Sequence, residues 1–120
     1  MEITSKIEEG ILIVTLSGNF LAGEEDLVGE KLKSLISPAH CKVVVDMEFV
    51  SSVTSQGLAM LILALKTALK LGGDVVLCSL QRSIAELFEL TRFHKVFEIY
   101  PSEIQAIASF SVRSRRKTPL

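Results

Sequence analysis

Hydrophobic residues along the chain form short extended runs that alternate with longer stretches of helical period. The clearest run, residues 43–45, is three consecutive valines, which is typical of a strand buried on both faces. The first two runs are separated only by Glu9 and Gly10, a turn signal that predicts an antiparallel hairpin. In all, the pattern predicts five strands, at residues 2–8, 11–16, 41–48, 74–79 and 96–100.

Apolar residues at helical spacing fill the segments between the later strands. They predict helices at 23–36, from Thr54 or Ser55 to just before Gly72, at 82–93 and at 102–110. Strands joined through helices need crossover connections and therefore pair in parallel. We expect an α/β fold in a single domain, with a mixed, mostly parallel β-sheet, an initial hairpin and flanking helices.

The turn between the third strand and the long helix is rich in hydroxyl groups. Ser51, Ser52, Thr54 and Ser55 lie here, and either Thr54 or Ser55 can cap the helix by accepting from its free N–H groups. A helix start also carries partial positive charge, so a hydroxyl at this position lies where a phosphate group could be held. This turn is the candidate functional site.

Composition limits what such a turn can belong to. The chain has 120 residues, 48% of them apolar, which suits one domain with a hydrophobic core. One tyrosine and no tryptophan argue against an aromatic platform for nucleic acid, so no direct nucleic-acid binding is expected. The longest apolar run, 58–65, is too short to span a membrane, and the N-terminal residues do not resemble a secretory signal. We expect a cytoplasmic protein without membrane insertion.

The last ten residues differ in charge from the rest of the chain. Residues 111–120 carry four basic side chains and no acidic ones, whereas the preceding residues carry nine basic and 14 acidic side chains, a net charge of about −5. We divide the chain into a domain at 1–110 and a basic, solvated and partly disordered tail at 111–120. An arm for nucleic acid or anionic lipid is the alternative interpretation of the tail.

Signals for catalysis are few. His40 and His94 do not lie in a zinc-binding pattern, and no glycine-rich phosphate loop or GxSxG nucleophile motif occurs. Cys41 and Cys78 lack CxxC spacing and are expected to be reduced thiols in or near the core. Asp46, which we place at the end of the third strand, suits a functional carboxylate and a turn or cap residue equally well. The sequence therefore predicts no catalytic residue, metal site or cofactor.

Residues 42–59 resemble the signature of STAS domains, typified by bacterial anti-sigma factor antagonists. In that family an apolar strand and a short connection lead to Asp-Ser-x-Gly-Leu at the start of a helix. The resemblance extends over roughly residues 3–110, with the segment 18–21 at the place of an early loop element and Gly72-Gly73 at that of paired glycines before a strand.

The resemblance implies a switchable binding module with no catalytic activity of its own. Family members bind an anti-sigma factor that is also a serine kinase and so free the sigma factor. Phosphorylation of the signature serine, which is Ser55 by position, breaks the complex, and a phosphatase restores it. The partner-binding residues carried over by position are Leu21, Thr54, Ser55, Gln56, Gly57 and Leu58.

Two positions depart from the family pattern. Thr54 stands where the family has an aspartate directly before the serine, and Leu21 replaces the aspartate of the early loop. A relative that is not phosphorylated, or is phosphorylated differently, is therefore an alternative.

Two other functions are compatible with the sequence. The first is a STAS subunit of a membrane transport assembly, and the second is a small nucleotide-binding protein or enzyme that uses the turn at Ser55. In addition, residues 58–65 are apolar around the whole helix, so part of this surface needs cover from a neighbouring helix, a second copy or another protein.

Overall fold

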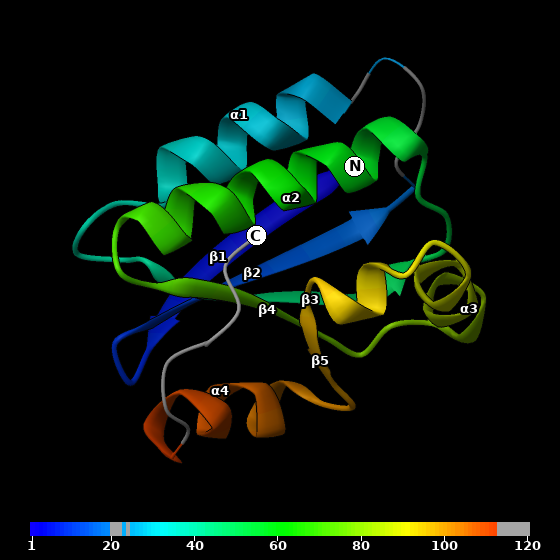
Figure 1. Ribbon diagram of the computed structural model, residues 1–120. Helices are drawn as coiled ribbons and strands as arrows, with labels where there is room; N and C mark the ends of the chain where they lie inside the picture. Colours follow the sequence, from blue (N-terminus) through cyan, green and yellow to red (C-terminus); the bar gives the residue numbers. More distant parts are fainter. Residues whose placement is uncertain (20–22, 24, 113–120) are drawn as a thin grey trace.

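Five strands and four α-helices make up the computed structural model, which describes residues 1–19, 23 and 25–112 (Figure 1). The strands are β1 (Glu2–Glu8), β2 (Ile11–Gly18), β3 (Lys42–Val50), β4 (Asp74–Cys78) and β5 (Glu98–Tyr100). The helices are α1 (Glu25–Leu35), α2 (Ser55–Lys70), α3 (Arg82–Leu90) and α4 (Glu103–Val112), with a 3-10 turn η1 at Phe93–Lys95. The predicted fold class is confirmed.

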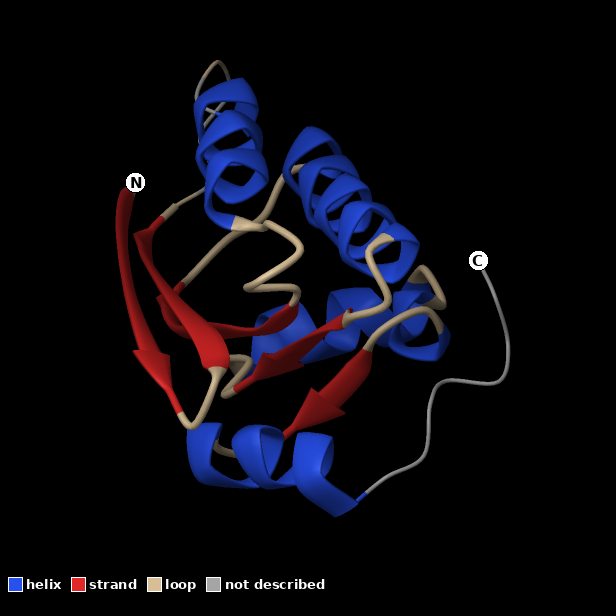
Figure 2. Cartoon of the chain, turned by 90° about the vertical axis from the view of Figure 1, so that its left-hand side faces the viewer, coloured by secondary structure: helices blue, strands red, loops and turns tan. Residues whose placement is uncertain are grey.

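The order of the strands explains where the helices lie. The sheet order is β1-β2-β3-β4-β5, with β1 antiparallel to β2 and every other pair parallel. Because right-handed crossovers that always move in the same direction keep their helices on one face, α1, α2 and α3 share one side of the sheet. Only α4, which follows the last strand, lies on the opposite side (Figure 2).

The central strands are buried on both faces, as their continuous apolar runs predict. On the face under α1, α2 and α3, Val43, Val45 and Met47 of β3 join the main core, to which α3 contributes Ile84 and Phe88. On the other face a smaller cluster packs against α4. Its buried members are Ile11, Ile13, Val44, Val76, Cys78 and Ala106.

A β-bulge in β3 carries this strand two residues beyond its predicted end. The pairing shifts by one residue where Thr15 and Ser17 of β2 face Asp46 and Phe49 of β3. The Asp46 carboxylate accepts a hydrogen bond from the Glu48 amide at 2.9 Å, which satisfies a donor inside the bulge. Asp46 therefore lies within the strand and not at its end, and the bulge directs the chain toward the hydroxyl-rich turn.

Other boundaries differ from the prediction for local reasons. The third helix ends at Leu90 instead of 93 because Arg92 adopts a left-handed conformation, with φ 64°. The chain then forms η1, and β5 begins only at Glu98. The fourth helix continues two residues past the predicted domain boundary at 110, to Val112. Residues 113–120, most of the predicted tail, lie outside the described part of the chain.

The two cysteines lie in different environments. Cys78 is fully buried in the smaller cluster, as expected of a core thiol, whereas Cys41 is partly exposed just before β3. None of the helices in the described ranges 1–19 and 25–112 is both long enough and apolar enough to cross a bilayer.

We predict that Gly73 is the glycine least tolerant of substitution. A methyl group on its α-carbon would overlap the Cys41 carbonyl, which accepts from the Asp74 amide at 3.0 Å where α2 passes into β4. Gly73→Ala should therefore lower the free energy of unfolding by about 3 kcal/mol, as measured by urea denaturation.

The matched control is Gly72→Ala. Gly72 has φ 86° but open space around its α-carbon, so only the strain of the left-handed conformation is expected, about 1–2 kcal/mol. Equal losses for the two variants would show that the close approach at Gly73 does not limit stability.

Candidate functional site

The hydroxyl-rich turn positions its side chains through the N-cap of α2. Thr54 is the capping residue, with φ −83° and ψ 166°, and its Oγ1 accepts from the Gly57 amide at 3.1 Å. The Thr54 carbonyl accepts from the Leu58 amide at 3.0 Å and begins the helical pattern. Ser55 is thus the first residue of the helix, and it is exposed.

A buried carboxylate from another helix completes this cap. Thr54 Oγ1 donates to Glu25 Oε2 at 2.6 Å, while Glu25 Oε1 accepts from the Gly23 amide at 2.8 Å. Glu25 is only 6% exposed although it opens α1. A buried carboxylate is costly unless it is hydrogen-bonded, so these two bonds fix the start of α1 against the turn before Ser55.

A second acidic side chain of α1 lies at the same place. Gln56 Nε2 donates to Asp26 Oδ1 at 3.4 Å, so this contact lies one residue after Glu25 in α1 and two residues after Thr54. Both helices run parallel to each other, since each follows a strand of the parallel part of the sheet, and Figure 1 shows them side by side. Their positive N-terminal ends are therefore neighbours, and acidic side chains lie between them.

The structure brings most of the predicted site residues together. Thr54 to Leu58 form one turn of helix, in which Ser55 and Gln56 are exposed while Gly57 and Leu58 are buried. Leu21 lies outside the described residues. That Leu21 and the residues from Thr54 to Leu58 bind a partner stays a prediction.

Glu25 and Asp26 are the site residues that the sequence analysis missed. Their charges suit the start of their own helix, but the contact with Thr54 spans 29 residues of chain. The signal lay in the topology. Because consecutive parallel strands end at the same edge of a sheet, the helices that follow them begin side by side.

The apolar helix α2 finds most of its cover within the domain. Leu61 and Leu65 are fully buried in the main core, and Met60 packs against Gly29 of α1. Between the two helices a groove of about 350 Å³ remains, with Asp26 near the site and Thr67 among its more distant lining residues. Leu63 lines it and is 54% exposed, so α1 does not cover the whole surface.

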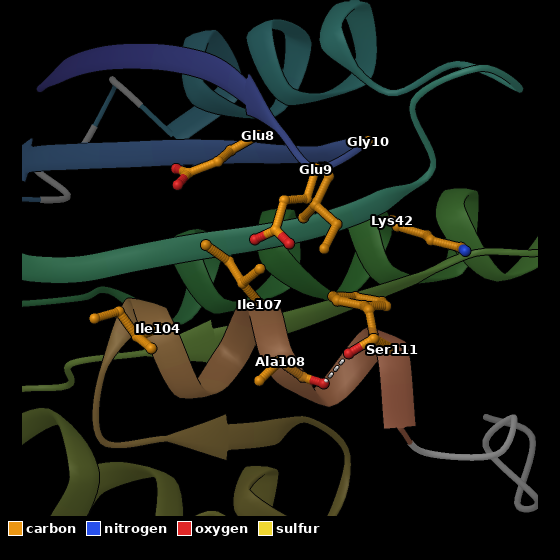
Figure 3. Close-up of a pocket in the computed structure, with 10 residues that line it drawn as sticks. Glu8, Glu9, Gly10, Lys42, Ile104, Ile107, Ala108 and Ser111 are labelled. Carbon is orange, nitrogen blue, oxygen red and sulfur yellow. Dashed lines mark hydrogen bonds between the residues drawn. The ribbon is translucent and has the colours of Figure 1, made fainter.

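Another pocket lies on the opposite face, between the β1–β2 turn and α4. It has a volume of about 430 Å³, and Figure 3 shows the turn on one side, α4 on the other and Lys42 at one end. Ile104, Ile107 and Phe110 form much of its apolar lining. Because the sheet separates α4 from α1 and α2, this pocket is not part of the site at Ser55.

Asp46 belongs to a cluster of titratable groups beneath the start of α4. Burial and a hydrogen bond with Asp46 raise the pKa of Glu103, although Lys6, with Nζ 3.4 Å from Glu103 Oε1, opposes this shift. Burial, with a smaller contribution from the Asp46 charge, raises the pKa of the Cys78 thiol to about 12. Asp46 therefore supports the bulge and the docking of α4, and it does not lie at the predicted functional turn.

The two histidines lie apart from the hydroxyl-rich turn and from the titratable groups around Asp46. His94 Nδ1 is 3.2 Å from the Phe88 carbonyl, and the His40 backbone forms a short bridge with Ser37. No group of three or more potential metal ligands occurs in the described ranges 1–19, 23 and 25–112.

A five-stranded mixed sheet with three helices on one face, the second of them capped by Thr54 just before Ser55, defines a small α/β domain. The sequence model of the STAS domain family matches residues 2–106, so the chain belongs to this family. The resemblance at residues 42–59 is thereby confirmed.

Two relatives match over nearly their whole length. The chain is 27% identical over 110 residues to BtrV of Bordetella bronchiseptica, which is provisionally named an anti-sigma factor antagonist, covering 92% of this chain and 95% of BtrV. It is 24% identical over 115 residues to the anti-sigma F factor antagonist of Paenibacillus polymyxa, covering 95% of this chain and 98% of that protein.

Solved structures share the fold. An anti-sigma factor antagonist from Mycobacterium paratuberculosis superposes with a TM-score of 0.80 at 18% identity, over 90% of this chain and 92% of its own. Unphosphorylated SpoIIAA, an anti-sigma factor antagonist, gives 0.69 at 12%, over 93% and 100%. The murine anion transporter Slc26a9 gives 0.75 at 18%, over 87% of this chain but only 18% of the transporter.

We predict that Thr54 and Glu25 are energetically coupled. Aspartate is itself a good N-cap, but Thr54→Asp would place a second carboxylate against buried Glu25. The variant should lose at least about 1.4 kcal/mol of unfolding free energy at neutral pH, and adding Glu25→Gln should restore most of it.

Urea denaturation of the two single variants and the double variant measures this coupling, with Thr54→Ser as the control that keeps a hydroxyl. Additive effects of Thr54→Asp and Glu25→Gln would contradict the coupling.

We also predict a pH dependence of stability from Glu103. Because the pKa of Glu103 is raised in the folded state, this group stabilises the fold at pH values below its ordinary pKa of 4.5. That contribution to the free energy of unfolding is lost as the pH rises through the folded-state pKa. Glu103→Gln should therefore flatten the decrease in urea midpoint as the pH rises above 4.5.

The control variant is Glu86→Gln, which makes the same charge change on exposed α3 and should leave that slope as in the wild type. A slope unchanged by Glu103→Gln would show that another group causes it.

Proposed function

We propose that this protein binds an anti-sigma factor, thereby frees a sigma factor, and is switched off by phosphorylation of Ser55. One observation carries the choice of residue. The Thr54 hydroxyl is used twice, accepting from the Gly57 amide and donating to Glu25, whereas Ser55 presents an exposed side chain at the start of α2. Of the two hydroxyl residues at the helix start, Ser55 is therefore the one available to a kinase.

The relatives support the binding function. Both curated relatives are named as anti-sigma factor antagonists and match this chain over more than 90% of its length. Another neighbour of this fold, SpoIIAA, has a structure in a phosphorylated form. In the proposed scheme the anti-sigma factor is itself the serine kinase, and a phosphatase reverses the modification.

The phosphoryl transfer needs only an accessible hydroxyl from this chain. Ser55 Oγ forms a bond to the γ-phosphorus of ATP held by the kinase, the bond to the β-phosphate oxygen breaks, and ADP leaves. The hydroxyl proton passes to a base of the kinase. The product carries about −1.5 to −2 charges at the surface of the turn, and this charge opposes contact with acidic or apolar groups of a partner.

An exposed apolar side chain lies beside the turn and suits a protein partner. Leu27 is 66% exposed and directly follows Asp26, which accepts a hydrogen bond from Gln56. A partner that covers Leu27 removes its apolar surface from water, which favours association. We place Leu27, with Ser55 and Gln56, in the proposed contact surface.

A role as a subunit of a transport assembly is the second candidate. It is favoured by the similarity of the fold to a segment of an anion transporter, which this chain matches over 87% of its own length. Copurification with a membrane transporter, and not with a sigma-factor regulator, would select this function.

We predict that phosphorylation occurs on Ser55 and changes with growth conditions. Phosphopeptide mass spectrometry on the protein from growing and stressed source cells should find the modification on Ser55, absent in Ser55→Ala and not shifted to Thr54. An unmodified peptide in both conditions would remove the phosphorylation step and leave a constitutive binding module.

A negative charge at Ser55 should also weaken the complex. With the anti-sigma factor as ligand, we expect Ser55→Glu to raise the dissociation constant at least about tenfold, since an interfacial charge easily costs about 1.4 kcal/mol. Ser83→Glu provides the matched control, because Ser83 is also exposed in the first turn of a helix, α3. Equal effects of the two variants would show that Ser55 has no special place in the interface.

A further inference from the structure

We propose that Glu25 is the internal competitor of a phosphoryl group on Ser55, so that phosphorylation expels the Glu25 carboxylate from the start of α2 and releases the start of α1. This inference rests on the proposed modification of Ser55 and adds how the modification acts within the domain. It assigns Glu25 the role of a positioning residue.

The argument begins with the two parallel helices. Their N-terminal ends carry partial positive charge and lie together, because Glu25 and Asp26 of α1 reach Thr54 and Gln56 at the start of α2. Like charges at this place would repel. The Glu25 carboxylate, 6% exposed, accepts from Thr54 at one helix start and from the Gly23 amide at the other, so its negative charge offsets this repulsion.

A phosphoryl group on Ser55 would enter the same small region. It is attached one residue from Thr54, whose hydroxyl is 2.6 Å from Glu25 Oε2, and it brings up to two negative charges. The first N–H groups of a helix have no partner within the helix, so they can bind the phosphoryl oxygens as readily as a carboxylate. Two anions then share positive charge that suffices for one, and the more highly charged and covalently held group prevails.

The loss of Glu25 from this position has a defined structural consequence. The hydrogen bonds that its carboxylate accepts from Thr54 Oγ1 and from the Gly23 amide join the turn before α2 to the start of α1. Since a carboxylate without these donors is costly to bury, its side chain moves toward water and the first turn of α1 loses its anchor. The phosphoryl group also repels the Asp26 carboxylate, so the hydrogen bond that Asp26 accepts from Gln56 weakens.

The effect reaches a surface that a partner can contact. Asp26 lines the groove between α1 and α2, together with Gly29 and Met60 deeper in it, and exposed Leu27 follows directly in α1. Movement of the first turn of α1 therefore changes the proposed contact surface beyond the modified serine itself. Phosphorylation acts through the shape of α1 as well as through its own charge.

The test introduces phosphoserine at position 55 in the full chain by genetic code expansion, in wild type and in Glu25→Gln. In the wild type we expect phosphoserine to raise the unfolding equilibrium constant about tenfold, because the two anions repel. In Glu25→Gln it should lower that constant, because a phosphoryl group alone at a helix start is favourable. Phosphoserine is thus expected to destabilise the wild type and to stabilise Glu25→Gln. If Glu25 had a purely structural role, phosphoserine would change the stability of both proteins in the same direction.

Glu30→Gln is the matched control, since Glu30 is an exposed glutamate of the same helix. It should leave the effect of phosphoserine as in the wild type. An equal effect of phosphoserine in wild type and Glu25→Gln would overturn the proposal, as would equal changes in the two glutamine variants.

Amide hydrogen exchange gives a second measurement that needs no substitution of Glu25. On phosphorylation of the wild type, the Gly23 and Val28 amides should lose protection, whereas Val44 and Val76 in the sheet should not change. Unchanged protection at Gly23 would also contradict the proposal. Neither measurement uses the anti-sigma factor, so failure here is distinguishable from failure to bind that partner.

Discussion

The buried Glu25 carboxylate is the interaction on which the arrangement around Ser55 depends. Sequential parallel strands and right-handed crossovers oblige α1 and α2 to begin at the same edge of the sheet, with their positive ends together. A negative charge between the helix starts removes this repulsion, and the hydrogen bond from Thr54 fixes its position. The topology brings the two positive helix ends together, and the negative charge of one acidic residue at the first position of α1 offsets their repulsion.

This arrangement also explains how the turn is stabilised without an aspartate at position 54. A hydroxyl both donates and accepts, so Thr54 caps Gly57 and holds Glu25 at the same time. An ionised aspartate could cap the helix but could only repel Glu25. The carboxylate near the serine is thus supplied from α1, and the residue before Ser55 serves as the connection between the two helices.

The local patterns in the sequence predicted the elements but not the contacts between distant ones. The three valines at 43–45 and the hydroxyl-rich turn indicated β3 and the start of α2, because strand burial and capping are local properties. The bulge depends on pairing with β2, and the contact of Glu25 with Thr54 depends on how two helices are aligned across the sheet. The early end of α3 at Leu90, two residues before the left-handed Arg92, had no glycine to mark it.

The bulge connects the second face of the sheet to the candidate functional turn. Asp46 accepts from the Glu48 amide and is hydrogen-bonded to Glu103 of α4, so the same side chain stabilises the bulge and the docking of that helix. Beyond the bulge, Val50 returns to the main core and the chain enters the turn that ends at Thr54. Since the bulge sets the residue at which β3 leaves the sheet, Asp46 helps to place Thr54 opposite Glu25, although it lies on the face away from α1 and α2.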